Sequence, residues 1–159
     1  MSSVAITVIE KGLDQAAAAI ARLTDPDKHE LMDVVGRMIQ LQTRQRLASD
    51  KTAPDGTPWQ DNYSKSSTLY ASGTLHDSID YHSTSDEVVI GSPLIYAAIH
   101  HFGGVIKPKN GKALAFSSGG KSYVVKSVTI PARPYLGLSV NNRDEIESIV
   151  AEFIGQVLQ

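Results

Sequence analysis

Cysteine is absent from the 159-residue chain, and its absence excludes three kinds of chemistry. The chain can form no disulfide, offer no thiolate to a metal ion and use no cysteine nucleophile. A lack of cysteine also fits a reducing compartment. Packing and hydrogen bonds must therefore stabilise the fold, and the length suffices because such a chain buries roughly 68–70% of its unfolded surface. The length predicts one domain over residues 1–159.

Long apolar runs are missing as well. No run approaches the roughly 18 residues that cross a bilayer. The N-terminus shows no basic segment followed by an apolar core. We therefore expect no membrane partner and no secretory signal.

The sequence also lacks the motifs that identify common enzymes. It contains no glycine-rich phosphate loop, no G-x-S-x-G and no H-E-x-x-H. The adjacent His100 and His101 point in different directions on a helix, so they make a poor pair of metal ligands. His76, Asp77 and Ser78 have the residue types of a hydrolase triad, but a triad is set by geometry in space and not by adjacency. We expect no enzymatic activity, no cofactor and no metal site, and we expect the histidines to serve packing, capping or an interface.

Acidic residues are missing from a long segment in the second half of the chain. Residues 88–142 contain no Asp or Glu but six Lys or Arg, although the net charge of the chain is only −2. One region of the surface should therefore be positive. Its basic side chains are Lys107, Lys109, Lys112, Lys121, Lys126 and Arg133.

This basic segment has two interpretations. Its lysines either face solvent or a protein partner, or they face the phosphates of a nucleic acid. Only Phe116 and Tyr123 are interleaved with the lysines, and no groove-reading motif is present. Any contact with nucleic acid should therefore be non-specific and sensitive to salt.

Two helices are predicted after a short strand at residues 4–8. The first ends near Thr24, and the second begins at Pro26, is capped by Asp25 and continues to about Leu47. The apolar stripe of the second helix consists of Leu31, Val34, Val35, Met38, Leu41 and Gln42. Its opposite face carries Arg37, Arg44 and Arg46.

The middle of the chain predicts β-structure. Residues 79–91 read as a hairpin, and residues 105–130 as a basic hairpin that projects from the body. Residues 131–136 should be extended, because two prolines bar a helix and remove ladder donors. A last helix, capped by Asn142 with Glu145 reaching back, presents the stripe Ile146, Ile149, Val150, Phe153 and Val157. The expected fold class is α+β, with N- and C-terminal helices packed on a mostly antiparallel sheet.

Two further features indicate docking. Residues 96–102 predict a short helix on which Tyr96, Ile99, His100 and Phe102 share one face, and the glycines at 103 and 104 end it. This aromatic face can dock within its own domain or onto a neighbour. Trp59, the only tryptophan, either anchors a turn-rich loop to the body or serves as an interface anchor.

Five short motifs occur in a fixed order. They are Pro-Asp-Gly-Thr-Pro-Trp at 54–59, Ser-Gly-Thr-Leu-His-Asp-Ser-Ile at 72–79, Ile-Gly at 90–91, Tyr-Ala-Ala-Ile-His-His-Phe-Gly-Gly at 96–104 and Ile-Pro-Ala-Arg-Pro-Tyr-Leu-Gly at 130–137. The ordered set resembles the virion-morphogenesis, or tail-completion, family of tailed bacteriophages, including Mu-like phages. His101 departs from the glutamine that often precedes Phe-Gly-Gly in that family.

The resemblance implies a structural virion protein of the neck or the head-proximal tail end. Such a protein assembles in the host cytoplasm as a ring, sixfold by default, that completes the tail and joins it to the head. The implied partners are further copies of the chain, the adjacent neck or connector proteins, the tail terminator or tube proteins, and the passing genomic DNA, bound non-specifically. A rival from another class is a non-specific nucleic-acid-binding assembly accessory protein that uses residues 105–133.

A ring subunit needs two different complementary surfaces. The residues predicted for this subunit interface are Trp59, Tyr96, Ile99, His100, Phe102, Gly103, Pro131, Arg133, Pro134 and Tyr135. Arg133 is expected to supply a directional bond to the neighbour. The residues predicted to face DNA or a partner are Lys107, Lys109, Lys112, Lys121 and Lys126.

Overall fold

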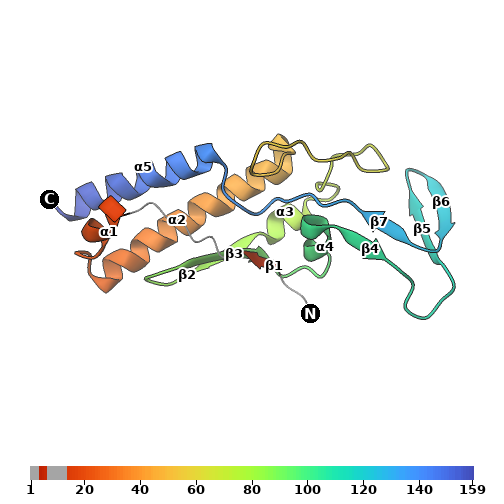
Figure 1. Ribbon diagram of the computed structural model, residues 1–159, viewed down its shortest axis with the longest axis horizontal. Helices are drawn as coiled ribbons and strands as arrows, with labels where there is room; N and C mark the ends of the chain where they lie inside the picture. Colours follow the sequence, from red (N-terminus) through yellow and green to blue (C-terminus); the bar gives the residue numbers. More distant parts are fainter. Residues whose placement is uncertain (1–3, 7–13) are drawn as a thin grey trace.

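The computed structural model of the protein describes residues 4–6 and 14–159. Two long helices, α2 (Asp25–Gln45) and α5 (Val140–Val157), lie side by side in one half of an elongated molecule, and strands form the opposite end (Figure 1). The fold is α+β, as predicted. Among the described residues, no helix has the length and apolar content needed to cross a membrane.

Helix α2 is the longest element and is preceded by α1 (Asp14–Ile20). The start of the predicted first helix, residues 9–13, lies outside the described residues. The predicted cap of α2 at Asp25 is wrong, because Thr24 is the extended residue there. The side chains of Thr24 and Asp27 each accept a hydrogen bond from the other's backbone N–H, at 3.4 and 3.1 Å. This reciprocal capping box satisfies two donors that the first turn leaves free.

The predicted inner face of α2 needs correction. Leu31, Val35 and Ile39 are buried as a stripe, but Leu41 is 56% exposed. The stripe continues through Gln42 and Thr43 into a π-helical turn, η1 (Arg46–Asp50), whose Arg46 and Leu47 are also buried. The placement of Arg46 on the outer face is therefore wrong.

A three-stranded antiparallel sheet packs on α2 in the order β1 (Val4–Ile6), β3 (Val88–Ser92), β2 (Asp80–Ser83). The predicted hairpin at 79–91 is confirmed by β2 and β3. Gly36 of α2 lets the ring of Tyr81 lie against the helix backbone, because a Cβ at position 36 would come within 2.3 Å of the Tyr81 ring. The Tyr81 hydroxyl donates to Asp33 at 2.9 Å.

Helix α5 covers α2 along its length. Val150 is buried, and Ile146 and Phe153 pack on the core. The predicted cap at Asn142 is wrong, because Ser139 caps the helix and Asn142 is the third helical residue, whose side chain accepts from the Ser139 N–H at 3.2 Å. Glu145 accepts a hydrogen bond from Gln42 of α2 at 2.6 Å instead of completing that cap.

We name residues 104–130 the arm. In it, β4 (Gly104–Ile106) pairs with β7 (Val128–Ile130), and the hairpin β5 (Leu114–Ser118) and β6 (Lys121–Val125) forms a sheet of its own. The short helices α3 (Thr74–Ser78) and α4 (Ala97–Phe102) lie between the helical half and the arm (Figure 1). The strands of the described residues thus form three separate antiparallel sheets.

Substitution of Gly36 tests how closely Tyr81 packs on α2. We expect Gly36→Ala to lower the free energy of unfolding by roughly 1–3 kcal/mol, because the added methyl group overlaps the ring. Urea denaturation followed by circular dichroism would measure the change.

The matched control is Gly155→Ala in α5. Apart from its own stretch of helix, no atom of the described residues lies within 4 Å of the position that the added methyl group would take, so helix propensity should stabilise this variant by up to about 1 kcal/mol. A Gly36→Ala midpoint equal to the parent's would contradict the tight packing.

Candidate functional site

We name residues 131–137 the central segment. The side chains of Arg133, Tyr135 and Leu136 in it are buried. The segment runs extended between the arm and α5, past α4 and η1 (Figure 1). The Pro134 carbonyl accepts a hydrogen bond from the Trp59 indole at 2.9 Å, and the Arg133 N–H donates to the His100 carbonyl at 2.9 Å. The residues of this segment were predicted to be extended, and its backbone groups bind groups of their own chain.

Arg46 holds the far end of the central segment. Its side chain is only 4% exposed and donates to the carbonyls of Tyr135 at 2.8 Å and Gly137 at 3.2 Å, and to the side-chain oxygen of Asn142 at 2.7 Å. Burial lowers the pKa of Arg46. One guanidinium thereby joins η1, the central segment and the first turn of α5.

The sequence does contain a signal for the buried position of Arg46. Leu31, Val35, Ile39 and Gln42 recur every three or four residues, and Arg46 is the next position of that series. The positive charge of Arg46 suggested a position on the surface. A guanidinium group, however, has five N–H donors and can bind carbonyl oxygens inside a protein.

His101 and Tyr135 connect α4 to the central segment. Tyr135 is fully buried, and its hydroxyl donates to the Ala97 carbonyl at 2.8 Å. His101 Nδ1 accepts from the N–H groups of Tyr135 at 3.3 Å and Leu136 at 3.5 Å. This Nδ1 must be unprotonated to accept these bonds, and burial lowers the pKa of His101 accordingly. A glutamine carbonyl could accept the same bonds.

Three residues predicted for the subunit interface have buried side chains. Arg133 is 5% exposed and donates to the carbonyls of Gln60 at 2.8 Å and Asp61 at 3.1 Å. Trp59 and Tyr135 are also buried. The contact of Arg133 with a neighbour stays a prediction, and within its own chain two nitrogens of its guanidinium bind the 60–61 backbone. Trp59 anchors its loop, which was the other interpretation of that residue.

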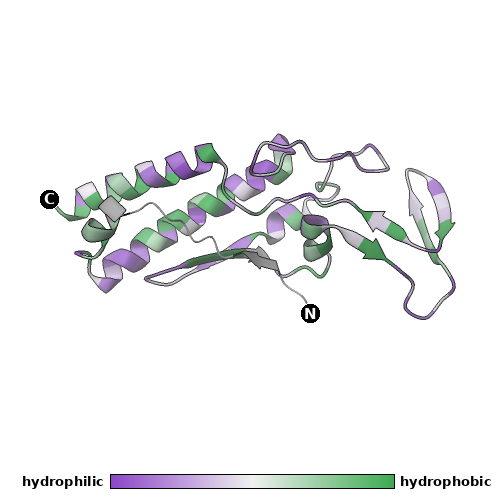
Figure 2. Cartoon of the chain, viewed as in Figure 1, coloured by the Kyte–Doolittle hydropathy of each residue, from purple (hydrophilic) through white to green (hydrophobic). Residues whose placement is uncertain are grey.

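The outer side of α4 remains available for contact with another molecule. Tyr96 is exposed, Phe102 is 65% exposed, and Ile99 and His100 are half-buried. Gly103 follows with φ +72°, and a Cβ there would come within 2.7 Å of the Ala132 N, so this position requires glycine to bring α4 against the central segment. Pro131 and Pro134 are half-buried. Figure 2 shows hydrophobic residues on α4 and β4.

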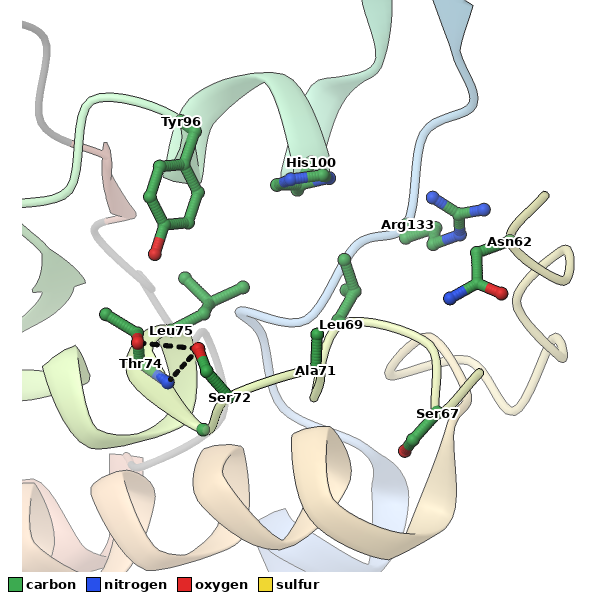
Figure 3. A pocket seen from close by; sticks show the side chains of 11 residues that line it. Asn62, Ser67, Leu69, Ala71, Ser72, Thr74, Leu75, Tyr96, His100 and Arg133 are labelled. Carbon is green, nitrogen blue, oxygen red and sulfur yellow. Dashed lines mark hydrogen bonds between the residues drawn. The ribbon is translucent and has the colours of Figure 1, made fainter. Parts of the chain in front are cut away.

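A cavity of about 410 Å³ lies beneath α4. Figure 3 places Tyr96 and Thr74 at one end of the cavity and Arg133 and Asn62 at the other, with His100 above it. His100 Nδ1 is buried without a hydrogen-bond partner, and burial, then the charge of Arg133, lower the pKa of His100. A neutral imidazole beside a guanidinium can receive a polar group, but it offers no paired acid and base.

The residues described here do not assemble a hydrolytic or metal site. His76 Nδ1 lies 2.7 Å from Asp77, but the Ser78 hydroxyl is bonded to the Leu75 carbonyl and the Ser92 hydroxyl instead. No group of three or more His, Asp or Glu side chains within residues 4–6 and 14–159 is placed to hold a metal ion.

The pH dependence of stability tests the role of His101. The folded state disfavours the protonated ring, so the unfolded chain binds more protons once the pH falls below the ordinary value of 6.5. The contribution of the neutral His101 ring to stability is fully present above that pH and is lost as the pH falls. We expect His101→Gln to cost roughly 1 kcal/mol at neutral pH, through the lost ring contact with Tyr135. The variant should then lose less stability than the parent on going from about pH 7 to about pH 5.

Urea titrations across that range would measure both slopes. His82→Gln, at an exposed position of β2, is the control for the removal of a histidine. A parental slope in His101→Gln would show that His101 is not held neutral.

Known proteins support the resemblance seen in the motifs. The profile of the phage virion morphogenesis family matches residues 6–155. The putative capsid assembly protein G of Escherichia phage Mu is 28% identical over 127 residues, which cover 74% of this chain and 72% of that protein. No solved structure matches the chain. A match over nearly the whole sequence shows that the chain belongs to the phage virion morphogenesis family and has a structural or assembly role in a phage.

Proposed function

We propose that the protein is a structural component of the phage neck or of the head-proximal end of the tail. Copies of it self-associate into a ring, sixfold by default, that completes the tail and joins it to the head. The ring lies between the neck or connector proteins and the tail terminator or tube proteins. It assembles in the host cytoplasm, is retained in the virion and acts by binding, without catalysis.

The observation that carries this proposal is the uneven distribution of exposed apolar side chains. Most of the large exposed ones belong to α4, the turn before it and the arm: Ile95, Tyr96, Phe102, Val105, Ile106, Phe116, Tyr123 and Val124. The hydrophobic core of the described residues includes none of these eight side chains. Apolar groups left exposed outside the core indicate a protein–protein surface.

The fold supports this use of α4. Gly103 and the central segment hold α4 in place through backbone contacts, so its outer residues need little ordering when they bind a partner. Phe102 extends the apolar surface from α4 to Val105 of β4. The buried members of the predicted interface, Trp59, Arg133 and Tyr135, act in this proposal by positioning α4 and not by contacting the neighbour.

Complementation of a phage that lacks the gene tests the function. We expect such a phage to accumulate heads and tails that are not joined, and the wild-type chain supplied in trans to restore infectious particles. Electron microscopy of lysates and plaque counts would measure this. Intact, infectious virions formed without the protein would contradict the proposal.

Phe102→Asp tests the surface itself. Placing a carboxylate in an apolar contact should weaken self-association by roughly 30-fold or more, since interface hot spots contribute about 2 kcal/mol or more. Light scattering across concentration would measure association, and circular dichroism would confirm folding.

Leu41→Asp is the matched control, because Leu41 is exposed on α2, away from α4. It should associate like the parent. Equal association of the Phe102 and Leu41 variants would remove α4 from the interface.

A further inference from the structure

The lysines of the arm and the carboxylates of α5 lie in opposite halves of this molecule. All five lysines of the arm are exposed, and the arm contains no acid. Helix α5 exposes Asp144, Glu147 and Glu152. Figure 1 shows α5 and the arm apart along the long axis, so the lysines of the arm cannot reach these carboxylates within one copy. No arm lysine forms an ion pair with any of the described residues.

The arm also contributes one wall of an apolar groove. A cavity of about 590 Å³ lies between residues 62–64 and the arm. The rings of Phe116 and Tyr123 stack at 5.4 Å on its wall, and Val128 and Ile130 contribute further apolar surface. The hairpin tip closes on the loop, because a Cβ at Gly119 would lie 4.0 Å from the Ser64 Cα.

Two lysines stand close in sequence to residues that line this groove. Lys121 begins β6, on the strand that presents Tyr123, and Lys126 follows Val125, which lines the groove. An apolar groove lined by residues that neighbour lysines fits a segment that combines an apolar side chain with carboxylates.

Helix α5 carries such a combination on its outer face. Val140, Asp144 and Glu147 follow one another at spacings of four and three, so they lie on one side of the helix. All three are exposed, Val140 by 72%. The buried side of α5 packs on α2 and is therefore not available to a second copy.

We propose that the arm groove binds the outer face of α5 of a second copy, with Val140 toward the apolar wall and Asp144 and Glu147 toward Lys121 and Lys126. This contact joins two different surfaces of identical chains. Each copy therefore binds one neighbour through its arm and another through its α5. The series of copies closes into a ring if the rotation between neighbouring copies permits it. The inference rests on the proposed self-association and adds this contact to the one proposed for the outer side of α4.

Two charge reversals test the contact. The first variant combines Lys121→Glu with Lys126→Glu, and the second combines Asp144→Lys with Glu147→Lys. Each variant alone sets like charges against each other, so we expect association at low ionic strength to fall by at least ~10-fold. Sedimentation velocity would measure it, with circular dichroism as the check on folding.

Mixing the two variants is the decisive step. The acidic arm of the first matches the basic α5 of the second, and the basic arm of the second matches the acidic α5 of the first. An equimolar mixture should therefore regain association within about threefold of the parent. Salt at about 1 M should weaken association of the parent and of the mixture, because charges are then screened within about 3 Å.

A control variant separates a local effect from net charge. Arg22→Glu combined with Lys28→Glu changes the total charge as much as the arm variant does, but in the helical half of the molecule. It should associate within about threefold of the parent. Loss of association in this control as large as that of the arm variant would overturn the proposal.

Other outcomes would also overturn the proposed contact between the arm and α5. A parent chain that stays monomeric at low ionic strength overturns the proposal, as does a mixture that fails to associate. If the arm reversal spares association but abolishes retention of double-stranded DNA, the arm faces nucleic acid instead. These results would leave the proposed function standing as long as virions still require the protein in the complementation experiment.

Discussion

The buried guanidinium of Arg46 holds together the parts of this protein that are distant in sequence. It donates to two carbonyls of the central segment and to the Asn142 side chain in the first turn of α5. A buried cation is costly unless oxygens satisfy its donors, and their positions are fixed once they do. Helix α2, the central segment and α5 are therefore constrained relative to one another from a single position.

The central segment extends this constraint to the other half of the molecule. Trp59, His101 and the His100 carbonyl bind consecutive parts of its backbone, and the Tyr135 hydroxyl binds the backbone of α4. The segment donates three of these bonds, through the N–H groups of Arg133 and Tyr135 and the Tyr135 hydroxyl, and accepts the fourth from the Trp59 indole. The motif at 130–137, one of those that suggested the family, thus maintains the fold and orients α4 and the arm.

This arrangement separates stability from assembly. Arg46, Trp59, Arg133 and Tyr135, which bind or belong to the central segment, are buried and hydrogen-bonded. The large apolar side chains of α4 and the arm are exposed instead. The charges are separated as well, with lysines on the arm and carboxylates on the outer face of α5. The proposed head-to-tail association would use these two ends of the elongated molecule.

The sequence by itself determined the features that depend on neighbours along the chain. The α+β class, both hairpins, the approximate extents of α2 and α5, the glycine stop after α4 and the positive arm follow from periodicity, turn residues and composition. Only the tertiary structure decided which side chains are buried around the central segment. Arg46, Arg133 and His101 bind backbone groups that lie 34 to 91 residues away. A pattern of neighbouring residues does not predict such distant pairs, because they form only when the whole chain has folded.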